Sequence, residues 1–117
     1  MKKFTPSHEW IDIQDDKATI GITKYAAKEL GEIVFVELPK VGRLVLAGQE
    51  ASVLESTKAA VDICSPLSGE VVAVNQELLD GTAAINHHPE STGWLYQIRL
   101  TNLKELDNLI DEESHEN

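Results

Sequence analysis

Two segments of the chain begin almost identically, GEIVFV at Gly31–Val36 and GEVVAV at Gly69–Val74. Each is a short, mostly apolar run of β-branched residues, which is typical of strands buried in a β-sheet protein. A repeat of one strand-length unit indicates two similar β units that pack face to face. We therefore expect a mainly β fold, a sandwich or flattened barrel with an approximate two-fold axis. The 117 residues fit a single domain, residues 1–117, with a frayed tail at 111–117.

Other segments fit the same architecture. HEWIDIQ and KATIGIT have strand length, and the residues between them, 14–17, form a plausible hairpin turn. A short helix near 24–30 is expected between Thr23, which can cap it, and Gly31, which can end it with a left-handed residue. GWLYQIRL predicts the last strand. A C-terminal helix near 102–112 is predicted from a possible capping pair and from one apolar face, namely Asn102 with Glu105 and Leu103, Leu106, Leu109 and Ile110.

Charge and cysteine content exclude several classes of function. Acidic residues outnumber basic ones by 20 to 10, so the formal charge of −10 argues against nucleic acid and anionic membranes as partners. Cys64 is the only cysteine, so the chain alone cannot form an internal disulfide or a multi-thiolate zinc site. No apolar stretch resembles a signal peptide or membrane span. We expect a cytoplasmic bacterial protein, or a mitochondrial matrix protein if a transit peptide has been removed.

The most unusual local feature is a lysine between two predicted strands. GRLVLAGQEASVLES and AAVDICS both have strand patterns, which places Lys58 at the tip of a hairpin that lacks Gly, Asn, Asp and Pro. A single turn lysine is usually only a solvated charge. Here, however, small residues flank it, and Glu55 and Asp62 lie on either side. Such an amine is accessible to an enzyme that acylates it, and amide formation would remove its charge.

These segments resemble the H-protein family of the glycine cleavage system, within the lipoyl/biotinyl-carrier fold and its hybrid, or hammerhead, motif. The resemblance covers about residues 4–109, and its motifs occur in the family's order. They are HEW at 8–10, GIT at 21–23, LGEIVFVELPKVG at 30–42, ESTKAAVDICSPLSGEVVAVN at 55–75, IN at 85–86 and GWL at 93–95.

The resemblance implies a carrier with no catalytic residues and with lipoate attached to Lys58. A PLP-dependent glycine decarboxylase (P protein) would load an aminomethyl group on the lipoyl arm, and a folate-dependent aminomethyltransferase (T protein) would unload it. A flavin-dependent dihydrolipoyl dehydrogenase (L protein) would reoxidise the dithiol. A monomer is expected. Recognition by the lipoate-attaching enzyme is assigned to the residues around the lysine, Glu55, Ser56, Thr57, Ala59 and Asp62.

The chain departs from the family at two places. The family usually has a proline and a bulky aliphatic residue at about the positions of Thr82 and Ala84, and the segment NHHPEST before GWL, which includes His87–Thr92, is also unusual. These departures concern partner docking. They keep open a second interpretation, an H-like lipoyl carrier or lipoyl-relay donor in another pathway.

Other functions have weaker support. Biotin carriage is disfavoured because Thr57 and Ala59 replace the two methionines of the biotin family, and the chain lacks the linker of 2-oxoacid dehydrogenase lipoyl domains. An unmodified interaction module, or a small hydrolase using His87 or His88, remains an alternative. Metal binding by His87, His88 and Glu90 is disfavoured because adjacent histidines diverge on an extended chain.

Five further residues are assigned structural roles. We expect His8 and Trp10 to position the first strand and Cys64 to be a small packing residue. Gly31 and Gly69 are assigned to backbone requirements, because neither belongs to a phosphate-binding motif.

Overall fold

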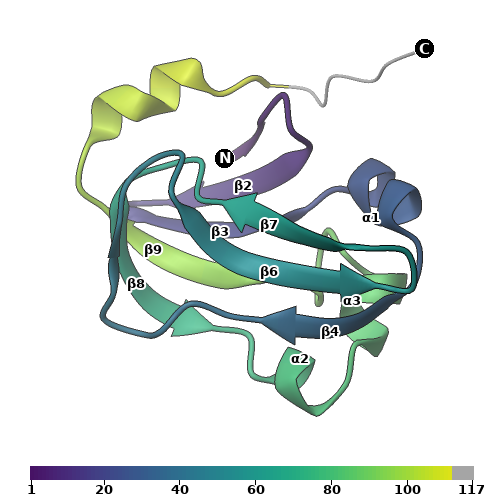
Figure 1. Ribbon diagram of the computed structural model, residues 1–117. Coiled ribbons are helices and arrows are strands. Elements are labelled where there is room, and N and C mark those ends of the chain that lie inside the picture. Colours follow the sequence, from purple (N-terminus) through teal and green to yellow (C-terminus); the bar gives the residue numbers. More distant parts are fainter. Residues whose placement is uncertain (112–117) are drawn as a thin grey trace.

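The computed structural model describes residues 1–111, which form two antiparallel β-sheets with short helices at their margins (Figure 1). The six-stranded sheet has the order β1 (Lys2–Phe4), β2 (Glu9–Gln14), β3 (Lys17–Ile22), β9 (Tyr96–Leu100), β8 (Gly69–Val74) and β5 (Leu44–Val45). The three-stranded sheet has the order β4 (Ile33–Glu37), β6 (Glu50–Ser56) and β7 (Ala60–Cys64). The mainly β prediction is confirmed, in its sandwich form, since the two sheets do not close into a barrel.

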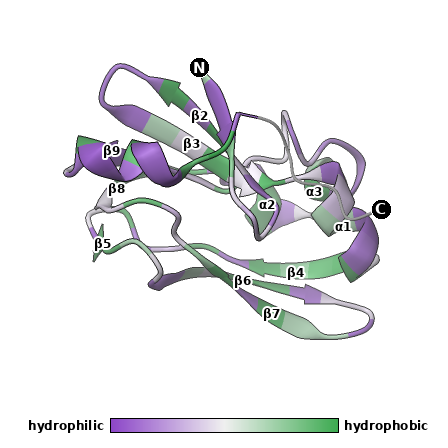
Figure 2. Ribbon diagram, turned by 90° about the horizontal axis from the view of Figure 1, so that it is seen from above, coloured by the Kyte–Doolittle hydropathy of each residue, from purple (hydrophilic) through white to green (hydrophobic). Residues whose placement is uncertain are grey.

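The two sheets share one hydrophobic core. Alternate residues of the strands point inward, as in Ile11 and Ile13 of β2 and Leu54 of β6, and together they form a single buried cluster. Figure 2 shows the three-stranded sheet as a layer apart from the six-stranded sheet, with hydrophobic residues along both. Burial of these apolar side chains is the main driving force for folding. It also fixes the register of the strands, because a slip of one residue would move the apolar side chains of a strand from the core face to the solvent face.

The repeated segments occupy different sheets. The first copy forms β4 and the second forms β8, and each has a break in register at the same position of the repeat, between Ile33 and Phe35 and between Val71 and Ala73. Such bulges bend a strand and change which side chains face outward. The sequence repeat therefore corresponds to a structural repeat, with one copy in each layer.

The first helix agrees with its prediction. α1 (Lys24–Leu30) begins after Thr23, whose hydroxyl accepts a hydrogen bond from the Ala26 amide at 3.2 Å. It ends at Gly31, whose φ of 84° and ψ of −165° are readily adopted only by glycine. The predicted turn at residues 14–17 is also present, and Asp15 there has a positive φ of 58°.

Three elements were missed by the sequence analysis. β1 precedes the first predicted strand, and two short helices, α2 (Glu77–Asp80) and α3 (Ala83–His87), connect β8 to β9. The segment NHHPEST is thus neither extended nor fully exposed, because His87 ends α3 and Pro89 is buried. These helices are too short to show a clear helical period in the sequence.

The predicted C-terminal helix near 102–112 is present, but it is shorter than expected and of the 3₁₀ type. The chain forms a 3₁₀ helix, η1 (Leu103–Asn108), and then becomes extended, so that Ile110 pairs with Phe4 through two backbone hydrogen bonds. The Glu105 carboxylate does not close a capping box. It accepts hydrogen bonds from the Ser68 amide and hydroxyl, both at 2.7 Å. These long-range contacts outweigh local helix propensity. Except for Asp111, the predicted frayed tail lies outside the described residues.

Candidate functional site: the tip of the β6–β7 hairpin

The turn between β6 and β7 is shaped by one hydroxyl group. Ser56 Oγ accepts hydrogen bonds from the amides of Lys58 at 3.0 Å and Ala59 at 3.1 Å, and it donates to the Ala59 carbonyl at 3.2 Å. The Ser56 amide also donates to that carbonyl, at 2.8 Å. No residue of the tip has a positive φ. This explains how the turn forms without the usual turn residues, since a serine side chain can satisfy the turn's amides.

The tip is also attached to the neighbouring loop. The Thr57 amide donates a hydrogen bond of 3.0 Å to the carbonyl of Glu32, in the junction between α1 and β4. The stem of Lys58 passes close to Gly31 in the same junction: a Cβ atom placed on Gly31 would lie 3.3 Å from Lys58 Cε and 3.8 Å from its Cδ. The hairpin tip is therefore fixed in position relative to the end of α1.

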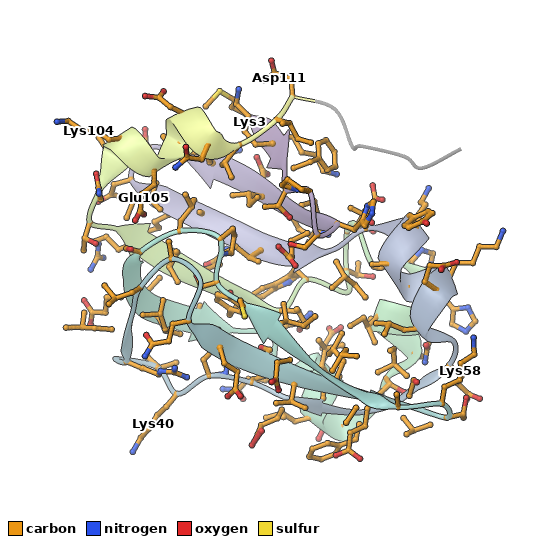
Figure 3. The ribbon with its side chains drawn as sticks, turned by 45° about the horizontal axis from the view of Figure 1, so that its top comes forward. Lys3, Lys40, Lys58, Lys104, Glu105 and Asp111 are labelled. Carbon is orange, nitrogen blue, oxygen red and sulfur yellow. The ribbon has the colours of Figure 1, made fainter. Side chains whose placement is uncertain are left out.

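Lys58 is exposed at this end of the molecule. Figure 3 shows it beside α1, whereas Lys40 and Lys104 lie toward the opposite end. None of the ion pairs among residues 1–111 includes Lys58. An accessible amine on a stiff hairpin, without an ion-pair partner in this part of the chain, is suited to enzymatic acylation.

The residues predicted to flank the lysine divide into two groups. Ser56 and Thr57 shape and anchor the tip, through a hydroxyl and an amide respectively. Glu55 and Asp62 are exposed, and they share the outer face of the three-stranded sheet because Asp62 pairs with Val53, two residues before Glu55. Ala59 is exposed beside the lysine. The structure therefore brings the predicted recognition residues together, and their recognition role stays a prediction.

A cleft opens next to the tip. Its volume is about 500 Å³, and its lining combines charged, polar and apolar side chains from α1, α3 and the α1–β4 junction: Lys24, Ala27, Lys28, Gly31, Glu32, Asn86, His87 and Pro89. Two of these residues, Gly31 and Glu32, also contact the lysine and its hairpin. A group attached to Lys58 would therefore start at the rim of this cleft.

One wall of the cleft is held by an asparagine. Asn86 Oδ1 accepts a hydrogen bond of 2.8 Å from the Ile33 amide, and its Nδ2 donates one of 2.9 Å to the Ile33 carbonyl. The side chain thus imitates a strand partner for the first residue of β4, while Ile85 beside it is fully buried. Asn75 has a similar role before β9, donating to the carbonyls of Thr92 and Trp94, both at 2.8 Å. Sequence reasoning quoted both asparagines in motifs but gave neither a role.

A second hollow of about 260 Å³ lies between β4 and α2. The bulge in β4 turns two consecutive apolar side chains outward, so that Val34 and Phe35 are each 53% exposed, and Leu79 of α2 is 60% exposed. Thr82, one of the residues that depart from the family pattern, lines this hollow, and Ala84 is partly buried against the core.

The HEW motif lies away from the hairpin in sequence and has mainly structural contacts. Trp10 is buried, and its Nε1 donates to the Pro89 carbonyl at 2.8 Å, which supports its expected role in positioning the first strand. Glu9 is buried too, and its Oε1 accepts from the hydroxyls of Thr5 at 2.7 Å and Ser7 at 2.9 Å. The His8 ring stacks near Tyr25, with 4.4 Å between the ring centroids, so it also contacts α1.

The remaining candidates are the residues of the NHHPEST segment and Cys64. Glu90 accepts a hydrogen bond from the Lys24 amide at 2.8 Å and pairs with Lys2, and no group of three possible metal ligands occurs within residues 1–111. The packing role predicted for Cys64 is wrong: its side chain is exposed, because β7 alternates and directs Val61 and Ile63, rather than Cys64, toward the core.

Comparison with known proteins agrees with the site. The family model described as "Glycine cleavage H-protein" matches residues 2–117. The chain belongs to this family. A glycine cleavage system H protein from Thermotoga maritima is 45% identical, with 99% of this chain and 94% of that protein covered. The one from Parvibaculum lavamentivorans is 48% identical, with 97% and 90% covered.

A solved structure supports the same assignment. The crystal structure of a glycine cleavage system H protein from Mycobacterium marinum matches with a TM-score of 0.81 and 42% sequence identity, over 86% of this chain and 84% of that one. The resemblance inferred from the motifs is thereby confirmed, as is the fold class. Within residues 1–111, no helix is long and apolar enough to cross a membrane.

Proposed function

We propose that this chain is a lipoyl carrier of the glycine cleavage system, with the lipoyl group attached to Lys58 through an amide bond. Family membership supports the assignment to the glycine cleavage system, and the hairpin geometry supports Lys58 as the attachment residue. The observation that carries the proposal is that Lys58 is exposed at a turn whose backbone is fixed from both sides, by Ser56 and by the Glu32 carbonyl.

A carrier needs little from its own residues beyond an exposed lysine on a fixed turn. When attached, the lipoyl group supplies the disulfide that the single Cys64 cannot form, and it provides the thiol that accepts the aminomethyl group. The protein presents the arm in a defined direction, which reduces the entropy that each partner enzyme must overcome in docking it. The chain itself acts as a non-catalytic component.

The cleft beside the tip supports a second task, shielding of the loaded arm. Gly31 and Glu32 lead from the lysine into the cleft, where Ala27 and Pro89 provide apolar surface and Asn86 provides a polar group. A loaded arm that folds into this space would be less exposed to water, which would slow hydrolysis of its cargo.

The partner enzymes we propose are glycine decarboxylase, the aminomethyltransferase, dihydrolipoyl dehydrogenase and a lipoate-attaching enzyme. Glu55 and Asp62 share one outward face near Lys58, which supports their proposed role in recognition by the attaching enzyme. The relatives named above come from bacteria, which supports the cytoplasm as the location.

Mass spectrometry of the protein purified from its own cells tests the proposal. We expect a lipoyl amide on Lys58 and not on the exposed lysines Lys40 and Lys104. Lys58→Arg should abolish both the modification and carriage of a glycine-derived group, while leaving the fold unchanged because the side chain is exposed.

Two results would count against the proposal. A bare Lys58 in cells whose other lipoyl proteins are modified would remove the carrier function. A modified Lys58 that a glycine decarboxylase cannot load would instead favour a lipoyl carrier or relay donor in another pathway.

A further inference from the structure

We infer that Gly31 is a positioning residue for the arm on Lys58. Its lack of a side chain lets the lysine stem lie against the α1–β4 junction and lead into the adjoining cleft. The inference rests on the proposed function, because it concerns where the modified lysine points. It assigns to Gly31 a role beyond ending α1.

The first observation is the contact itself. A Cβ on Gly31 would lie 3.3 Å from Lys58 Cε, 3.8 Å from Lys58 Cδ and 3.8 Å from Thr57 Oγ1. The first of these distances is shorter than an ordinary van der Waals contact between carbon atoms. A Cβ at position 31 would therefore require the lysine stem to move by a few tenths of an ångström.

The second observation is that this contact is held in place from both sides. The Thr57 amide donates to the Glu32 carbonyl at 3.0 Å, and the Gly31 amide donates to the Ala27 carbonyl at 3.2 Å. The hairpin tip and the end of α1 are thus joined through backbone hydrogen bonds. With the tip held by the Thr57 bond, an added Cβ would have to be accommodated by movement of the Lys58 side chain itself.

The third observation is the route that Gly31 borders. Gly31 and Glu32 both line the 500 Å³ cleft, and both contact the lysine hairpin. Gly31 therefore lies both beside the lysine stem and in the wall of the cleft. Displacing the stem would bias the arm toward solvent and away from the cleft.

The chain offers a control that matches Gly31 in its positive φ. Gly48 has a φ of 87°, against 84° for Gly31, and it lies before β6, at the other end of that strand from Lys58. A Cβ on Gly48 would meet nothing within 4 Å. Gly48→Ala thus reproduces the unfavourable φ without touching the arm.

The test compares the unaltered protein, Gly31→Ala and Gly48→Ala, each lipoylated and then loaded by a glycine decarboxylase with glycine. After removal of the enzyme, water breaks the carbon–sulfur bond to the cargo and gives formaldehyde, ammonium ion and the free thiol. We expect this release to be about fivefold faster in Gly31→Ala, at the low end of site-to-site coupling effects, and unchanged in Gly48→Ala.

The outcomes separate this inference from the proposed function. Equal release rates in the two variants, with both fully lipoylated, would overturn the role of Gly31 and leave carriage intact. Absence of lipoate from Lys58 of the unaltered protein would overturn the function instead.

A measurement on the unaltered, unmodified protein keeps the inference testable even if Gly31→Ala does not fold. We expect nuclear Overhauser contacts between the Gly31 α-protons and the Lys58 ε-protons. Their absence would contradict the proposed packing of the stem.

Discussion

The two copies of the repeated segment have the same beginning and the same bulge, but different surroundings. In the second copy, Gly69 is the first residue of β8 inside the six-stranded sheet. A Cβ at this position would lie only 2.3 Å from the Arg99 carbonyl oxygen. In the first copy, Gly31 faces the lysine stem and the cleft, and the strand that follows it exposes Val34 and Phe35. The second copy is thus part of the scaffold, whereas the first copy borders the site around Lys58. The same local sequence acquires different tasks from its long-range neighbours.

The largest effect that this comparison predicts is on folding at Gly69. Gly69→Ala forces the β8 and β9 backbones apart, and we expect a loss of about 3 kcal/mol or more in the free energy of unfolding. Gly31→Ala, where the neighbour is a flexible lysine stem, should cost less, about 1–3 kcal/mol for a backbone conformation that is essentially restricted to glycine. Urea denaturation of both variants measures the difference. A larger loss in Gly31→Ala would reverse our assignment of the two copies.

A second prediction concerns Tyr96, which pairs with Val74 at the end of the second copy. Its side chain is fully buried, and burial raises the pKa of Tyr96 well above its usual value. Above pH 10 the unfolded chain loses this proton while the folded chain keeps it, so stability falls as pH rises, by about 1.4 kcal/mol per pH unit. Below pH 10 the tyrosine is neutral in both states and contributes no slope.

Tyr96→Phe should remove that part of the alkaline decline while changing stability little at pH 7, since the buried hydroxyl has no hydrogen-bond partner among the described residues. Denaturation curves of both proteins between pH 8 and about pH 11.5 make the comparison. An identical decline in the two proteins would show that other groups cause it.

The smallest predicted effect is at the outward face of the first copy. Phe35→Ser should change the free energy of unfolding by less than about 0.5 kcal/mol, because the ring is more than half exposed. The neighbouring Val36 is 2% exposed, and Val36→Ala should cost about 2 kcal/mol for the methyl groups it removes from the core. Similar losses in both variants would mean that Phe35 and Val36 do not differ in burial as described.

Local sequence patterns predicted the elements whose causes are local. The cap at Thr23, the glycine stop at Gly31, the turn at residues 14–17 and the exposed lysine between two strands all depend on residues a few positions apart. The repeat also located one strand in each layer, and the family resemblance added the assignment of Lys58.

The features that the sequence did not predict depend on partners far along the chain. Asn86 bonds to Ile33, 53 positions away, and Glu105 bonds to Ser68 rather than completing its own helix cap. The helix expected near 102–112 is shorter than predicted for the same reason, because pairing of Ile110 with Phe4 requires an extended chain. No period or local motif encodes such contacts.

The hydrogen bond from the Thr57 amide to the Glu32 carbonyl has a consequence for how the lysine is recognised. The position of the hairpin tip depends on Glu32, which a short peptide around Lys58 would lack. An attaching enzyme that requires the folded tip would modify the intact chain far faster than the isolated segment Ser52–Cys64. Lipoylation of Lys58 would then mark chains that have folded, and the mark would be measurable as a fixed increase in mass.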